Sequence, residues 1–243
     1  MKKALLTLTT IFVAAQLLAQ NFEVSVQANS GLFRYGGSSA TSNSFITEGP
    51  NQVNYTNNPF GSKNGFSYGW DLQVQHAGKC GFIFGLQAGY DILRSKVNIN
   101  EYHDSNFILF PGPNSPGGYV EVPVKGQTYL QDQDRNINPY IGYRLQTKKV
   151  KIDLLPGIDL GINIGSYDKG YTIDGDRNIY RTNLKLTNAP TDVRPGFGIA
   201  AWYGRFGITA AYSVGLTNLD KSTAGNGSAH SELLRFGITC RIF

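Results

Sequence analysis

The sequence predicts an all-β protein: an eight-stranded antiparallel up-and-down transmembrane β-barrel of the outer-membrane type, preceded by a cleaved signal peptide. Three observations predict this class. Apolar and polar residues alternate with a period of two, short and long connections alternate between these segments, and the composition is low in charge (16%) and rich in glycine (29 residues). Soluble domains average about 25% charged residues and about 7% Gly. The mean hydropathy of −0.23 excludes a helical membrane protein.

The N-terminal residues have the order of a secretory signal. A lysine pair at positions 2 and 3 precedes an apolar run over 4–15, and residues 17–19 (Leu-Leu-Ala) form a cleavage-site pattern. Residues 1–19 are therefore predicted to be a signal peptide, and residues 20–243 one barrel domain. Loss of the two lysines lowers the net charge from +5 to +3. This excess is too small to indicate a nucleic-acid partner.

Eight segments carry the alternation. In the clearest, Val150, Ile152 and Leu154 alternate with Lys151 and Asp153. Such a pattern gives each strand one apolar and one polar face. The segments are 22–29, 66–75, 82–92, 140–146, 150–164, 193–203, 206–216 and 234–242.

The connections between the segments alternate in length. Short turns are expected at 76–79, 146–149 and 203–205, and long connections at 36–63, 96–131, 166–190 and 218–229. In outer-membrane barrels short turns face the periplasm and long loops face outside, so both termini are expected to be periplasmic. A closed barrel satisfies every backbone group in lipid. The alternative is a secreted sandwich or lipocalin-like barrel, whose apolar faces would form the core.

The polar faces together predict a charged lumen. An eight-stranded barrel is just wide enough for side chains to fill it, and charges held away from water must be paired. The sequence therefore predicts a charge-neutral network of side chains that fills the lumen, so that the barrel is closed and does not form a channel. Its acids are Glu23, Asp71, Asp91, Asp153 and Asp159, and its bases are Arg144, Lys151, Arg194, Arg235 and Arg241.

Ser228, His230 and Glu232 recur at every second residue before the last segment and would share one face. They raise the alternative of a deacylase-like enzyme acting on envelope lipid. Residues two apart on a strand lie about 6.6 Å apart, which strains the contact that a nucleophile and its base require. The favoured interpretation is that they close the fourth long connection. No catalytic residue, metal or cofactor is expected, and a narrow small-solute pore is the other alternative.

Three smaller features belong to the connections and segment ends. Asp174 to Asn178 favour a hairpin turn over a calcium loop. Cys80 and Cys240 fall in the outward phase and are expected to face lipid without forming a disulfide. An apolar run in the second long connection is a candidate partner contact, consisting of Phe107, Ile108, Leu109 and Phe110.

The closing residues 235–243 (Arg-Phe-Gly-Ile-Thr-Cys-Arg-Ile-Phe), the Leu-Ala-Gln at the end of the signal and the eight amphipathic segments resemble the PorT-type outer-membrane barrels of Bacteroidota, with an OmpX-like architecture. The resemblance implies that Phe243 is an assembly signal read by the barrel-assembly machinery, and it implies a link to type IX-like protein secretion. We therefore expect a noncatalytic component of the outer membrane. Its expected partners are outer-membrane lipids, the assembly machinery and an envelope or secretion protein at the extracellular loops.

Overall fold

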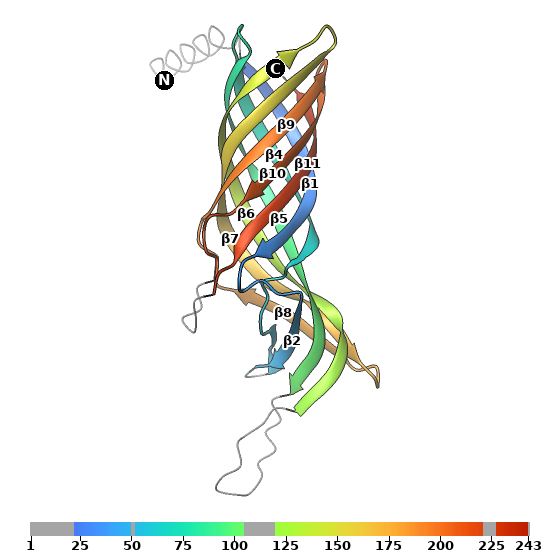
Figure 1. Ribbon diagram of the computed structural model, residues 1–243. Helices are drawn as coiled ribbons and strands as arrows, with labels where there is room; N and C mark the ends of the chain where they lie inside the picture. The colour runs from blue at the N-terminus through green and yellow to red at the C-terminus, as the bar shows by residue number, and fades with distance from the viewer. Residues whose placement is uncertain (1–21, 50–51, 105–119, 221–226, 243) are drawn as a thin grey trace, which may run out of the picture.

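A computed structural model describes residues 22–49, 52–104, 120–220 and 227–242 (Figure 1). The described residues fold almost entirely as strands, which confirms the all-β class. None of them forms a helix long and apolar enough to cross a membrane. The strands are β1 (Phe22–Gly36), β2 (Asn43–Glu48), β3 (Asn54–Thr56), β4 (Lys63–Ala77), β5 (Phe82–Asp104), β6 (Val120–Gln146), β7 (Val150–Asp174), β8 (Ile179–Leu186), β9 (Asp192–Tyr203), β10 (Phe206–Val214) and β11 (His230–Arg241).

Eight of these strands pair antiparallel in a closed ring, in the order β1, β4, β5, β6, β7, β9, β10, β11 and back to β1. Closure is visible at Val26, which is in register with Leu72 of β4 on one side and with Cys240 of β11 on the other. The strands are tilted against the barrel axis (Figure 1). The ring therefore leaves no open sheet edge along its wall.

Tight turns close one end of the ring. They join β4 to β5, β6 to β7 and β9 to β10, and Gly81 and Gly204 adopt positive φ angles of 90° and 60° there. Glycine takes such angles without the steric cost that a Cβ would bring. Cys80 lies in the first of these turns and is exposed, so its expected place on a lipid-facing strand is wrong. β5 begins after the turn at Gly81, at Phe82, which is also the first residue of the expected segment.

Three strands lie outside the ring, in addition to the eight segments expected from the sequence. β5, β6 and β7 continue beyond the ring, β2 pairs parallel with the outer part of β5, β3 pairs with β2, and β8 pairs with β7 (Figure 1). We call this outer sheet the protrusion: β2, β3, β8 and residues 94–104, 120–131 and 166–174.

The protrusion corrects the expectation of long loops at 36–63, 96–131 and 166–190: strands cover much of the described part of the last two, and the first contains the short strands β2 and β3. Their inward side chains make an apolar core of their own, and burial of that core stabilises strands. The hairpin expected around Asp174 is present, since Ile173 and Ile179 are in register. The core residues are Ile46, Val97, Ile99, Tyr102 and Val124.

A second apolar cluster, which we call the cap, lies where the ring meets the protrusion. It joins inward side chains of β1, β5, β6 and β11 to residues of the connection before β11. The cap covers the polar interior of the ring at the end opposite the tight turns. Its buried members are Phe33, Tyr35, Leu93, Leu130, Leu219, Ala229 and Leu233.

Candidate functional site

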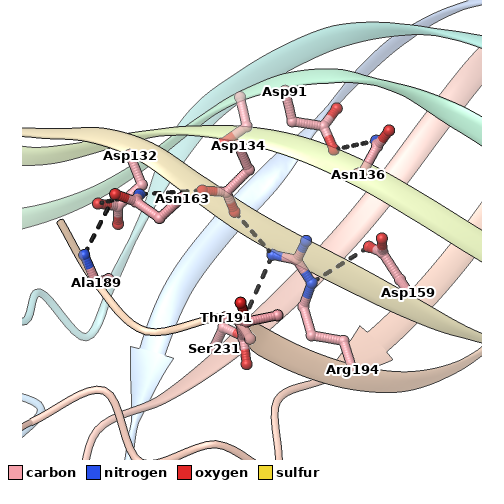
Figure 2. A network of polar contacts seen from close by, with 12 residues as sticks. Asp91, Asp132, Asp134, Asn136, Asp159, Asn163, Ala189, Thr191, Arg194 and Ser231 are labelled. Atoms are coloured by element: carbon pink, nitrogen blue, oxygen red, sulfur yellow. Dashed lines mark hydrogen bonds and ion pairs between the residues drawn. The ribbon is translucent and has the colours of Figure 1, made fainter.

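The centre of the lumen is organised by Arg194 of β9, which is fully buried. Its Nε lies 3.2 Å from Asp159 Oδ2, and its Nη1 lies 3.5 Å from Asp134 Oδ2 and 3.6 Å from Asp192 Oδ2. Figure 2 shows the guanidinium group reaching between Asp134 and Asp159, which come from β6 and β7. One cation is thus shared by carboxylates from its own strand β9, from the adjacent strand β7 and from β6, the strand after that.

A second buried arginine extends this network toward β4 and β5. Arg235 Nη2 lies 2.5 Å from Asp91 Oδ2 and 3.4 Å from Asp159 Oδ2. Asn136 Nδ2 donates to Asp71 Oδ1 at 2.9 Å and to Asp91 Oδ2 at 2.7 Å. Asn136 therefore links two carboxylates that would repel each other if left in direct contact.

A separate cluster lies near the tight turns. Arg144 forms paired hydrogen bonds with Glu23 (2.7 and 2.7 Å) and with Asp153 (2.6 and 2.8 Å). Trp202 Nε1 donates to Asp153 Oδ2 at 2.9 Å, and Arg241 lies over the Trp202 ring at 4.5 Å while its Nη2 is 2.9 Å from Glu23 Oε2. Bidentate arginine–carboxylate pairs of this kind are strong and geometrically specific.

The structure brings together all but one of the predicted lumen charges. Lys151 is half-buried beside an open cavity of about 500 Å³ that Glu23 and Arg144 also line. Its ammonium group forms none of the ion pairs found in the described residues. Lys151 thus stands apart from the network that the arginines build.

Sequence reasoning missed three lumen carboxylates: Asp132, Asp134 and Asp192, all buried. The signal for two of them is the recurrence of Asp132, Asp134 and Asn136 at every second residue, in residues 132–139, which belong neither to a predicted loop nor to a predicted segment. Within the described residues the lumen is consequently richer in carboxylates than in arginines. It is not the balanced set of five acids and five bases that the sequence suggests.

Neutral donors satisfy the additional carboxylates. Asp132 accepts hydrogen bonds from Tyr35 Oη and Ser166 Oγ, each at 2.5 Å, and Ser231 Oγ donates to Asp192. Asn163 Nδ2 donates to Asp134 Oδ1 at 3.1 Å (Figure 2). Hydrogen bonds to a buried carboxylate compensate part of its lost hydration, so an acid need not be matched by a base.

The lumen is filled. Between the two arginine clusters lies a cavity of about 60 Å³, room for only a few water molecules, and the cap covers the outer end. This geometry does not favour the alternative of a narrow pore.

The predicted Ser228, His230 and Glu232 group is divided among separate partners. Ser228 Oγ accepts from Ser38 N at 3.2 Å, His230 Nδ1 lies 3.1 Å from the Thr217 carbonyl oxygen, and Glu232 Oε2 lies 2.6 Å from Arg34 Nη2. Among the described residues these contacts leave no serine–histidine hydrogen bond. The arrangement does not favour the lipid-modifying alternative.

Several predicted features lie outside the described residues: the signal peptide 1–19, the assembly signal Phe243, and the run Phe107, Ile108, Leu109 and Phe110.

Within the described residues, no group of three or more His, Cys, Asp or Glu side chains is placed to hold a metal ion.

No family model and no curated protein matches the sequence. Among solved structures, the chain is similar to Neisserial surface protein A (NspA), with 15% identity and a TM-score of 0.38, over 90% of this chain and 97% of that one. It is also similar to Ail, the attachment invasion locus protein of Yersinia pestis, with 11% identity and a TM-score of 0.35, over 92% and 100% of the two chains.

Proposed function

We propose that the ring spans the outer membrane and that the protein is a noncatalytic component of the cell envelope that acts through its protrusion. One observation carries the proposal. The two faces of the barrel wall exchange polarity at a single level, just below the cap.

Below this level most of the outward side chains are apolar and exposed. Ile238 is 69% exposed and its cross-strand neighbour Ile208 66%, and on the opposite side of the ring Ile141 of β6 is 57% exposed. An apolar surface that encircles a protein is unfavourable in water and is typical of a wall in contact with hydrocarbon.

At the cap the polarity reverses on neighbouring strands. On β1, Asn29 faces inward and Leu32 outward below the level, whereas Phe33 is buried and Arg34 exposed above it. On β11 the inward side chain changes from Arg235 to Leu233, and outward-facing Glu232 is in register with Arg34. The strands continue through this level without a break, so the alternation of inward and outward side chains is unchanged. The exchange of polarity therefore reflects a change in the medium that surrounds the wall.

β5 makes the same change. Its outward side chain Leu86 is 48% exposed, and Asp91 is buried in the lumen. Two residues after Asp91, the inward side chain is Leu93, which belongs to the cap. The outward side chain of Arg94 donates a hydrogen bond to Gln131. Hydrocarbon ends and water begins at this level, which supports a protrusion standing in the extracellular space and tight turns in the periplasm.

The proposed partners follow from these placements. Outer-membrane lipids would cover the apolar belt, and the barrel-assembly machinery would insert it. A partnership with an envelope or secretion-system protein, of the type IX-like kind, is the part of the proposal that rests on the PorT-type resemblance. That protein would contact the protrusion.

Cysteine labelling tests the orientation. Cys80 is exposed in a tight turn, and Gly175 lies at the tip between β7 and β8, where an added Cβ would meet no atom within 4 Å. In intact cells a membrane-impermeant maleimide should leave Cys80 unlabelled until the outer membrane is permeabilised. Gly175→Cys in a Cys80→Ser background should be labelled at once. Cys240, constant in both proteins, is the background.

Labelling of Cys80 in intact cells together with protection of Gly175→Cys would reverse the orientation. Recovery of the protein in the soluble fraction would refute membrane residence. A crosslinker with one maleimide and one photoreactive group, attached to the same Gly175→Cys protein, tests the partner, because an envelope partner should give a discrete crosslinked adduct that the Cys80→Ser parent lacks.

A further inference from the structure

The outward face of the protrusion carries an unusual set of side chains. We call it the basic face and define it by Arg94 and Lys96 of β5, Lys125 of β6, Lys169 of β7, and Arg181 and Lys185 of β8. All six lie on one side of the sheet, opposite the core of the protrusion.

Tyrosines and amides alternate with these cations across the strands. Tyr171 is in register with Gln127 on one side and Arg181 on the other. Lys169 is in register with Tyr129 and Asn183 in the same way. Side chains directly opposite each other on a sheet lie about 5 Å apart, so the Tyr171 ring has a cation and an amide within reach of one ligand group, and the Tyr129 ring lies between Lys96 and Lys169.

Contacts within the face hold several of these groups in place. Arg94 Nε donates to Gln131 Oε1 at 2.9 Å, and Lys169 Nζ lies 4.6 Å from the centre of the Tyr167 ring. Gln127 Nε2 donates to Asn98 Oδ1 at 3.2 Å. Side chains ordered in this way lose less conformational entropy when a ligand binds.

The face has no carboxylate where β6, β7 and β8 lie side by side. The outward residues of 125–131, 167–173 and 179–185 include no Asp or Glu, and the one acid in these stretches, Asp168, is 1% exposed and faces inward. Tyr171 is 56% exposed. A surface that concentrates one sign of charge and leaves an aromatic ring open attracts an anionic ligand with apolar faces.

We propose that the basic face binds an acidic polysaccharide. The CH faces of sugar rings stack on tyrosine, sugar hydroxyls hydrogen-bond to Asn and Gln, and carboxylate or sulfate groups pair with Lys and Arg. An extended chain fits a face whose cations are spread over four strands. A phosphorylated lipid head group would instead lie at the level of Arg34 and Glu232, where the wall changes polarity, and most of the basic face lies beyond that level.

Binding is measured with the full-length barrel folded in detergent micelles. The probes are heparin as a sulfated chain, polygalacturonate as a carboxylated chain, and dextran as an uncharged one. Both acidic chains should bind, more weakly as salt rises, and dextran should not. Single-stranded DNA and vesicles containing an anionic phospholipid are the comparison ligands and should bind more weakly than the acidic chains.

Two pairs of variants locate the site. Lys169→Gln with Arg181→Gln should weaken binding by about tenfold or more, the loss expected when charge-assisted contacts worth about 1.4 kcal/mol disappear. Lys148→Gln with Lys149→Gln removes the same charge from an exposed tight turn at the other end and should change binding by less than about twofold. Tyr171→Ala should weaken binding several-fold, and Tyr171→Phe should retain it.

If the double variant at Lys148 and Lys149 lost as much affinity as the double variant at Lys169 and Arg181, binding would depend only on the net charge of the protein. That result would overturn the proposal. Tighter binding to DNA or to anionic vesicles, or an unchanged affinity in Tyr171→Ala, would overturn it as well. This inference rests on the proposed extracellular position of the protrusion, but the experiments can refute either claim without refuting the other. Surface labelling of Gly175→Cys without polysaccharide binding refutes only this inference, whereas binding without surface labelling refutes only the orientation.

Discussion

The ring and the protrusion share β5, β6 and β7 but are built in opposite ways. In the ring part of β5, Leu86 faces outward at 48% exposure and Asp91 is buried at 2%. Further along the same strand the buried side chain is Val97, at 1%, and the outward side chain is Lys96. The backbone alternation continues while the polarity of each face is exchanged.

This contrast shows that a period of two specifies two faces but not which one is inside. The surrounding medium decides that. In the proposed membrane placement, hydrocarbon selects apolar side chains outside and leaves ion pairs and hydrogen bonds to hold the lumen, whereas water selects an apolar core and a polar surface. The two regions should therefore respond differently to the loss of a charge and to the loss of an aliphatic group.

The largest effect is expected from Arg194→Ala. Removal of this buried guanidinium leaves Asp134, Asp159 and Asp192 without their shared cation, and breaking a buried charge cluster costs about 3–5 kcal/mol. Urea unfolding in micelles measures the loss. Lys151→Ala, which removes a lumen-side base outside the ion pairs, should change the free energy of unfolding by less than about 0.5 kcal/mol. Equal losses would contradict the described network.

A smaller and local effect is expected from Ile99→Ala. Ile99 is 1% exposed in the core of the protrusion, and truncation of a buried isoleucine costs about 2–5 kcal/mol. Hydrogen exchange should accelerate in β2 and β3 while the pairs between β1 and β11 remain protected. Exchange that accelerates throughout the ring would show that the two regions unfold as one unit.

The next effect concerns Asp168, which lies in the protrusion outside the proposed membrane-spanning part. Its carboxylate accepts hydrogen bonds from Thr56 N (2.6 Å), Thr56 Oγ1 (2.9 Å) and Thr182 Oγ1 (3.1 Å), and so ties β3 to β7 and β8. Burial raises the pKa of Asp168, although these hydrogen bonds lower it in part. The folded protrusion therefore binds this proton more tightly than the unfolded chain does.

The sign of the pH dependence follows from that pKa. The stabilisation from protonating Asp168 is complete below its ordinary value of 3.8 and is lost as pH rises through the raised pKa. After correction for the intrinsic exchange rate, protection of the Thr56 amide should increase as pH falls from neutral. Asp168→Asn should remove the dependence on pH. A dependence that persists in Asp168→Asn would assign the titration to another group.

The smallest effect is expected from Ser228→Ala. Its hydroxyl contacts Ser38 at an exposed site, so the free energy of unfolding should change by less than about 0.5 kcal/mol. Lipid A acylation in the host envelope should also be unchanged when measured by mass spectrometry. If lipid A acylation changed while the Ser228→Ala barrel remained folded, the alternative of a lipid-modifying enzyme would be supported.

The sequence shows which residues can share a face, and from this come the ring strands and most of the charged lumen. It does not show the protrusion, since the parallel pairing of β2 with β5 joins Asn43 to Asn98 across 55 residues that include β3 and β4, and no local pattern encodes that contact. The missed Asp132 and Asp134 lie in residues 132–139, between the expected loop at 96–131 and the expected segment at 140–146, whereas β6 already begins at Val120.

Local chemistry in the chain thus determines the alternation, the tight turns and the kinds of charge available for the interior. Only the closed ring decides that Arg194 lies between Asp134 and Asp159, since three strands must first come into register. Only the tertiary structure places Lys169, Tyr171 and Arg181 on one open face. Pairing between distant strands depends on the entropy of closing the intervening loops and on the area that the whole sheet buries. Neither quantity can be obtained from a short segment of sequence.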